Sequence, residues 1–74
     1  MHGTHGEALN ALLACRNQAE INAWWIDELA RYNNSDFGRD KTEVELMSII
    51  KSNMRFLAGH YNDGTYYRVG ALLK

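Results

Sequence analysis

The stretch that decides the fold is residues 21–32, which reads INAWWIDELARY and holds both tryptophans of the chain side by side. At about 100° per residue, a helix through this stretch separates apolar side chains from charged ones. The apolar arc holds Ala19, Ile21, Ala23, Trp25, Ile26, Leu29, Ala30 and Tyr32, and the charged arc holds Glu20, Asp27, Glu28 and Arg31. Because adjacent residues cannot share a helix face, we expect Trp25 to enter the core and Trp24 to lie among the charges.

Length and composition indicate one small α-helical domain. The chain has 74 residues, no proline and a single cysteine, Cys15, and good helix formers dominate residues 7–32 and 42–58. A lone cysteine excludes an internal disulfide, and a chain of this size usually needs another source of stability, such as self-association. Its apolar runs are too short for a membrane span. We therefore expect a cytoplasmic all-α protein that is completed as a bundle by self-association.

The charges are balanced overall but uneven along the chain. The formal net charge of −1 favours neither a nucleic acid nor a membrane as the partner. Residues 1–37 carry two basic and five acidic side chains, a net of −3, whereas residues 38–74 carry six basic and four acidic ones, a net of +2. This asymmetry could order an association between copies of the chain, or it could be accidental.

Two helix-start signals divide the first half of the chain. Thr4 with Glu7 has the spacing of a capping box, and Asn17 with Glu20 repeats that spacing. The second signal predicts a break near Asn17, although neither glycine nor proline lies between Glu7 and Tyr32. We favour one long helix over residues 6–33, bent near Asn17, and keep a pair of helices as the alternative.

The remaining segments follow from composition. Residues 1–5 are small, polar and glycine-bearing, so we expect them to be frayed. Residues 34–40 form a loop, whose Phe37 should tuck back over the end of the core. The next helix covers residues 41–59. Residues 60–74 form a turn and then either a short helix, which we favour, or a β-hairpin.

The helix over residues 41–59 has the clearest apolar periodicity, and Asp40, followed by Glu43, supplies its start signal. Its apolar arc consists of Leu46, Met47, Ile50, Met54, Leu57, Ala58 and Tyr61. Ile49 and Phe56 form a second stripe on the far side, which the C-terminal segment or another subunit must cover. We therefore predict two long antiparallel helices plus a short C-terminal segment.

No group of residues indicates catalysis, a cofactor or a metal site. His2 and His5 are three residues apart, but no carboxylate or cysteine stands beside them to complete a metal shell. A helix C-terminus favours a histidine such as His60 without any catalytic role. Cys15 follows an alanine–leucine stripe, which is typical of a small core residue rather than a nucleophile. We therefore expect a protein that is not an enzyme and holds neither cofactor nor metal.

Surplus apolar side chains favour a role in protein–protein binding. Trp24 on a charged arc has the form of an interface anchor, and Ile49 with Phe56 has no function in a simple helical hairpin. Glu28 and Arg55 would be charges at the rim of the interface. We expect a homodimer whose second face binds a target protein through these five residues.

In size and composition the chain resembles the compact helical accessory proteins of phages, which implies an inhibitor or regulator of another protein. The alternative is a small DNA-binding regulator that uses Lys51 and Arg55, on the basic side of the helix over residues 41–59. A third hypothesis is an oligomer that binds a small aromatic or nucleotide ligand between its subunits, near His60 and the tyrosine cluster of Tyr61, Tyr66 and Tyr67.

Overall fold

The computed structural model describes residues 3–74 and is all-helical over that range. Its helices are α1 (His5–Leu13), α2 (Gln18–Asn33), α3 (Glu43–Ala58) and α4 (Thr65–Leu72). The described residues include no strand, so the all-α prediction is confirmed. Within the described chain, no helix combines the length and apolar character needed to cross a bilayer.

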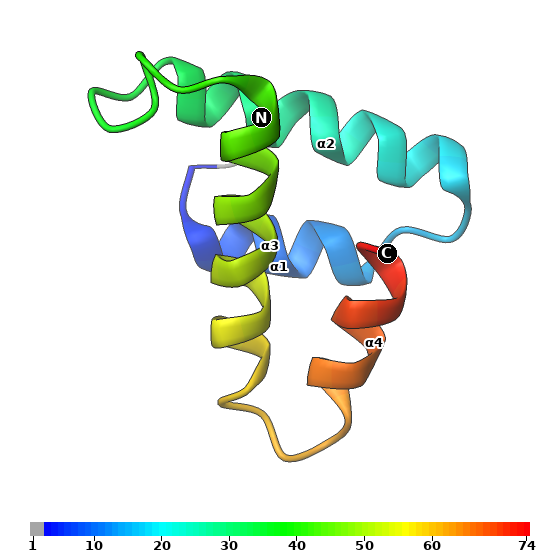
Figure 1. Ribbon diagram of the computed structural model, residues 1–74. Coiled ribbons are helices and arrows are strands. Elements are labelled where there is room, and N and C mark those ends of the chain that lie inside the picture. The colour runs from blue at the N-terminus through cyan, green and yellow to red at the C-terminus, as the bar shows by residue number, and fades with distance from the viewer. Residues whose placement is uncertain (1–2) are drawn as a thin grey trace.

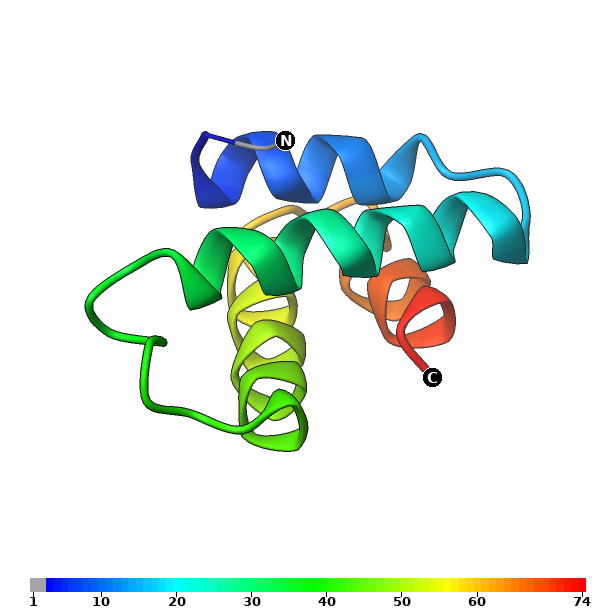
Figure 2. The ribbon, with the colours of Figure 1, turned by 90° about the horizontal axis from the view of Figure 1, so that it is seen from above.

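The helices form two crossed layers (Figure 1, Figure 2). α1 and α2 lie side by side and run in opposite directions, and α3 and α4 form a second antiparallel pair that crosses the first. We expected the helix over residues 41–59 to lie antiparallel to the helix over residues 6–33, which holds the tryptophans. Instead α3 runs across α2 and also packs on α1 and α4.

The core is centred on one apolar face of α3. Leu46, Ile50 and Met54 recur every four residues and are fully buried, as the helical period requires. Around them pack buried side chains from α1 (Ala8, Leu9, Leu12), from α2 (Trp24, Tyr32) and from the C-terminal segment (Val69, Leu73). Tyr61, which we expected on the same arc of α3, is exposed because that helix ends at Ala58.

α1 and α2 are separate helices, so the favoured continuous helix is wrong. α1 ends at Leu13, and Asn17 takes an extended conformation as the N-cap of α2. Asn17 Oδ1 accepts a 2.9 Å hydrogen bond from the backbone N–H of Glu20, whose carboxylate accepts one from the backbone N–H of Arg16. This reciprocal cap satisfies the free N–H groups of α2, and the chain reversal brings α1 against all the other helices.

The start of α1 also has a local cause. Thr4 is its N-cap, and Thr4 Oγ1 accepts a 3.1 Å hydrogen bond from the backbone N–H of Glu7. His5 is the first residue of the helix. Of residues 1–5, which we expected to be frayed, residues 1 and 2 lie outside the described range, while the last two are part of this capped start.

α2 is rotated about its axis relative to the prediction. Trp24 is buried, with 3% of its surface exposed, whereas Ile26 is 69% exposed and Trp25 is half-buried. The rotation is about 100°, or one residue. Three alanines widened the predicted apolar arc, but an alanine buries little area compared with an indole ring. Both faces hold a tryptophan, so ring size does not choose between them, and the buried face is the one on which Trp24 Nε1 donates to the Ala8 backbone oxygen.

Two further helix starts differ from the expected ones. α3 begins after Thr42 rather than after Asp40, because Thr42 and Glu45 form a complete capping box with two backbone hydrogen bonds of 3.2 Å. α4 follows Gly64, whose φ of 87° lies in the left-handed region that favours glycine. The C-terminal segment is thus a turn and a helix rather than a hairpin.

Candidate functional site

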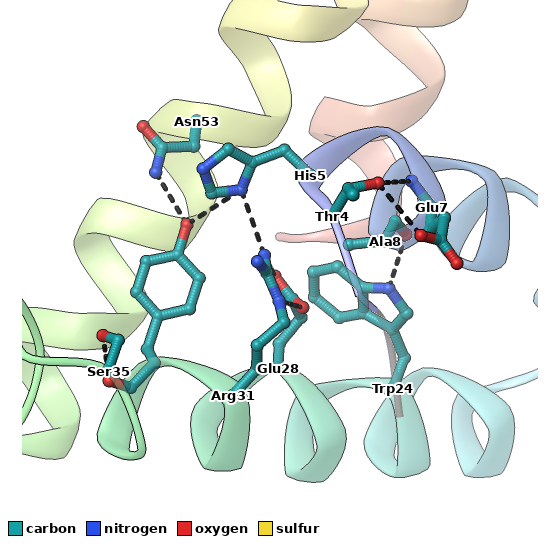
Figure 3. Close-up of polar contacts among 10 residues, drawn as sticks. Thr4, His5, Glu7, Ala8, Trp24, Glu28, Arg31, Ser35 and Asn53 are labelled. Carbon is teal, nitrogen blue, oxygen red and sulfur yellow. Dashed lines mark hydrogen bonds and ion pairs between the residues drawn. The ribbon is translucent and has the colours of Figure 1, made fainter.

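A buried ion pair organises the side of the molecule where α1, α2 and α3 meet (Figure 3). Glu28 is fully buried and accepts two hydrogen bonds from Arg31, one from Nε at 2.8 Å and one from Nη2 at 3.0 Å. Such bidentate pairs are among the strongest ion pairs in proteins. The hydrogen bonds to Glu28 raise the pKa of Arg31 above its ordinary value, so the guanidinium stays charged. Glu28 is therefore not the exposed rim charge that we expected.

Side chains from the other two helices join this ion pair. Arg31 Nη2 donates to His5 Nδ1 at 3.0 Å. His5 Nδ1 also lies 3.5 Å from the Tyr32 hydroxyl. Asn53 Nδ2 donates a 2.7 Å hydrogen bond to that hydroxyl. Because a guanidinium can only donate, His5 Nδ1 is an acceptor, and the proton of the neutral ring is at Nε2. One polar network thus connects α1, α2 and α3 (Figure 3).

Trp24 ties α2 to α1 within the same region. Its Nε1 donates a 2.8 Å hydrogen bond to the backbone oxygen of Ala8, and its ring lies edge-on to Trp25 at 5.1 Å between centroids. A buried indole N–H needs such a partner, because an unsatisfied donor is costly. Trp24 is therefore an anchor inside the subunit, and the expectation that it lies exposed among charges is wrong.

A hollow of about 410 Å³ opens beside the network, and its lining residues are His5, Arg31, Tyr32, Ser35, Phe37 and Asn53. The loop on one side is held by Ser35, whose hydroxyl donates to the Tyr32 backbone oxygen at 2.6 Å and accepts from the Gly38 N–H at 3.2 Å. Phe37 was expected to cover the core. Instead it is 57% exposed, with the Lys41 ammonium 4.5 Å from its ring centroid. Its ring is an aromatic wall of the hollow.

A second cluster of aromatic side chains lies where the chain passes from α3 to α4. This aromatic corner consists of Phe56, His60, Tyr66 and Tyr67. The first two rings meet edge-on at 5.0 Å, and the two tyrosine rings do so at 5.6 Å. Gly59 lies next to the second pair, since a side-chain carbon added there would be 3.9 Å from the Tyr66 ring. Phe56 is 70% exposed and Tyr67 is 80% exposed.

The five residues predicted to bind a protein do not share one surface. Trp24 and Glu28 are buried, and Ile49 is half-buried and packs against the core. Only Arg55 and Phe56 are exposed, side by side in the sequence near the end of α3. The structure therefore places two of the five predicted residues at the aromatic corner.

The sequence reasoning considered the tyrosines only as part of a ligand site, not of a protein-binding surface, and it missed the hollow. Tyr66 and Tyr67 are neighbours in a short helix, where two adjacent side chains cannot both face the core, so the exposure of at least one of them had a detectable signal. The hollow had none. Its side chains come from positions as distant as His5 and Asn53, and only the crossing of the helices brings them together.

The remaining candidates for chemistry lack a suitable setting. The Cys15 thiol donates to the Ala11 backbone oxygen at 3.4 Å, and burial, followed by the charge of Glu20, raises its pKa above the ordinary value. An activated cysteine needs the opposite shift. Within residues 3–74, no three His, Cys, Asp or Glu side chains are grouped so that they could hold a metal ion. His2 lies outside the described residues.

Comparison with known proteins yields no match, whether to a family model, a curated protein or a solved structure. Function must therefore be argued from the chemistry of the hollow and of the aromatic corner.

Proposed function

We propose that this chain is a small, non-enzymatic protein-binding module and that the aromatic corner is its binding surface. The observation that carries the proposal is the exposure of Phe56 and Tyr67, at 70% and 80%, in two ring pairs on either side of the α3–α4 turn. Burying such a ring against a partner contributes about 1.5–3 kcal/mol. Two rings of this kind on so small a chain favour a partner that covers them.

The corner has the composition of an interface hot spot. Aromatic side chains are enriched at the centres of protein interfaces, where tyrosine adds a hydroxyl that can form hydrogen bonds. His60 Nδ1 donates to the Phe56 backbone oxygen at 3.0 Å, which leaves its Nε2 available for a hydrogen bond with a partner. Arg55 is exposed beside Phe56 and supplies a rim charge. An inhibitor or regulator that acts by covering another protein's surface is the role that this composition supports.

A second copy of the chain is the first partner to test. The corner belongs to the half of the chain with a net charge of +2, whereas residues 1–37 carry −3. Glu7 and Glu20 are exposed on the layer formed by α1 and α2. Contact between the corner of one copy and this acidic layer of the other would bring opposite charges together. We propose that such a homodimer, in the cytoplasm, completes the helical bundle.

DNA binding, the alternative function, has less support. Lys51 and Arg55 lie one turn apart on α3, which is the start of a basic face. However, Arg31, Arg39 and Lys41 each lie within ion-pair distance of a carboxylate. Binding to the phosphate backbone depends on a dense set of cations that are free to replace counterions. The cations that remain on α3 are too sparse to favour a nucleic acid over a protein.

Sedimentation velocity over a wide concentration range tests the proposed homodimer. The double variant Phe56→Ala/Tyr67→Ala removes both exposed rings, and Val44→Ala removes an exposed apolar side chain at the opposite end of α3. We expect the wild type and the control to form dimers as concentration rises, and the double variant to stay monomeric. A wild type that is monomeric throughout, or a double variant that dimerises equally well, would contradict the proposed homodimer.

A further inference from the structure

The hollow beside the Glu28–Arg31 pair is a second candidate site, separate from the aromatic corner. Its volume of about 410 Å³ lies within the range of roughly 300–1,000 Å³ that is typical of small-molecule pockets. Its lining comes from α1, α2, α3 and the loop after α2, and it includes no residue of the aromatic corner. The proposed protein-binding function therefore leaves the hollow unexplained.

Polar groups in the lining keep unused hydrogen-bonding capacity. Asn53 donates through Nδ2 to Tyr32, but its Oδ1 accepts from no described residue. Arg31 uses Nε and Nη2 for Glu28 and His5, and among residues 3–74 its Nη1 group has no acceptor. The Nε2–H of His5 likewise has none. Figure 3 shows these three side chains converging from three helices. The lining can thus offer donors and one acceptor to a ligand.

Aromatic rings supply flat surfaces in the same hollow. Phe37 is exposed at the hollow, and so is His5, whose ring is tilted by 38° against the buried Tyr32 ring at 6.0 Å between centroids. The Tyr32 ring itself lies under the Arg31 guanidinium at 5.0 Å. An aromatic ring gains from stacking on such surfaces whatever its exact substitution pattern. A planar ligand is therefore favoured over a branched aliphatic one.

The charge of the hollow decides between a neutral ligand and an anion. The Arg31 guanidinium is already paired in a bidentate manner with Glu28, and the Lys41 ammonium beside Phe37 lies 3.7 Å from the Asp40 carboxylate. Each cation that could attract a phosphate or carboxylate ligand is therefore compensated. A neutral ligand needs no such attraction and can still use the free hydrogen-bonding groups.

We propose that the hollow binds a neutral, planar heteroaromatic molecule of the nucleobase class. The ring of the ligand stacks on Phe37, the exposed aromatic ring of the lining. Its edge accepts from Arg31 Nη1 or His5 Nε2 and donates to Asn53 Oδ1. The nucleobases combine a flat ring with donors and acceptors on one edge, which is the pattern that this lining complements.

Titration of the ¹⁵N-labelled protein, followed by amide chemical shifts, tests this site. The probes are adenosine, guanosine, cytidine and uridine, with inorganic phosphate as the anionic comparison. We expect saturable shifts with at least one nucleoside, confined to residues around the hollow. Stronger binding of phosphate than of every nucleoside, or no saturable shift with any nucleoside, would overturn the proposal.

Phe37→Leu is the discriminating variant, because its side chain is exposed and the change leaves the buried core intact. Removing the ring should weaken nucleoside binding by at least about fivefold, the loss typical of one stacking partner. The control, Val44→Ala, lies outside the lining and should bind like the wild type. Equal affinity in Phe37→Leu and wild type would overturn the stacking assignment. Since neither variant touches the aromatic corner, the result is independent of the sedimentation experiment.

Discussion

The hollow and the aromatic corner are both rich in aromatic side chains, but the fold holds them differently. Tyr32, which lines the hollow, and Trp24, about two turns earlier on α2, are buried and form hydrogen bonds to groups on other helices. Phe56 and Tyr67, at the corner, are exposed and meet neighbouring rings edge-on. The first pair joins helices together, whereas the second pair presents apolar area to solvent.

This difference separates two kinds of residue that the sequence alone does not distinguish. A change to a buried, hydrogen-bonded ring should lower the stability of the fold, because it removes a hydrogen bond that joins two helices. A change to an exposed ring should leave stability within about 0.5 kcal/mol and act on binding instead. The following variants test this distinction.

Gly38→Ala should have the largest effect on stability. A Cβ added there would lie 2.8 Å from the carbonyl carbon of Tyr32 and closer still to its oxygen, and these backbone atoms cannot yield easily. We expect the free energy of unfolding in urea to fall by about 3 kcal/mol, the upper end of what overpacking costs. Gly70→Ala is the control. It has no neighbour within 4 Å and lies inside α4, so it should stabilise by up to about 1 kcal/mol.

Trp24→Phe should have the second-largest effect on stability. The change removes the Nε1 donor and leaves the buried oxygen of Ala8 without its 2.8 Å hydrogen bond. We expect a loss of about 2 kcal/mol, measured by urea unfolding. Trp25→Phe is the matched control, because among residues 3–74 its indole nitrogen donates to no acceptor. Equal losses in the two variants would show that ring volume, and not the hydrogen bond, holds α2 on α1.

Tyr32→Phe should have a smaller effect. It removes the hydroxyl that accepts the 2.7 Å hydrogen bond from Asn53 and keeps the buried ring. We expect the free energy of unfolding to fall by about 1 kcal/mol. In Tyr61→Phe the lost hydroxyl is at an exposed position, and stability should not change measurably. A neutral result for Tyr32→Phe would mean that the polar network does not stabilise the crossing of α2 and α3.

Asp63→Asn should have the smallest effect on stability, and it tests the hydrogen bonds in the turn between α3 and α4. Hydrogen bonds from the Thr65 side chain and backbone lower the pKa of Asp63 below its ordinary value of 3.8. Because the folded pKa is the lower one, the stabilisation is present above pH 3.8 and is lost as the pH falls through the folded value. We therefore expect acid unfolding of the variant, followed by circular dichroism, to depend less on pH in this range. Identical profiles would contradict the assignment.

The comparison of α2 with α3 explains how much of the fold could be predicted. The buried face of α3 is entirely apolar, at Leu46, Ile50, Met54 and Ala58, so its periodicity predicts its orientation correctly. The buried face of α2 includes Glu28. A pattern of apolar residues cannot identify a carboxylate that is buried because Arg31 compensates it.

The candidate sites show the same contrast: local apolar patterns could be predicted, and contacts between distant residues could not. Phe56 could be predicted, because a second apolar stripe on an amphipathic helix requires a cover or a partner. Trp24 could not be placed correctly, because its partner is a backbone oxygen sixteen residues away on another helix. The hollow depends on the crossing of three helices and on a close loop approach at Gly38. Local sequence patterns contain no information about such long-range geometry.

The most direct test of the central claim, that the aromatic corner binds a protein, is photo-crosslinking in living cells. A photoreactive phenylalanine analogue replaces Tyr67 in one variant and Val44, equally exposed but outside the corner, in another. We predict that position 67 forms a discrete crosslink to a protein, either a second copy or a different partner. We also predict that adding Phe56→Ala abolishes it and that position 44 forms none. No crosslink at position 67, or the same crosslinks at both positions, would contradict the account.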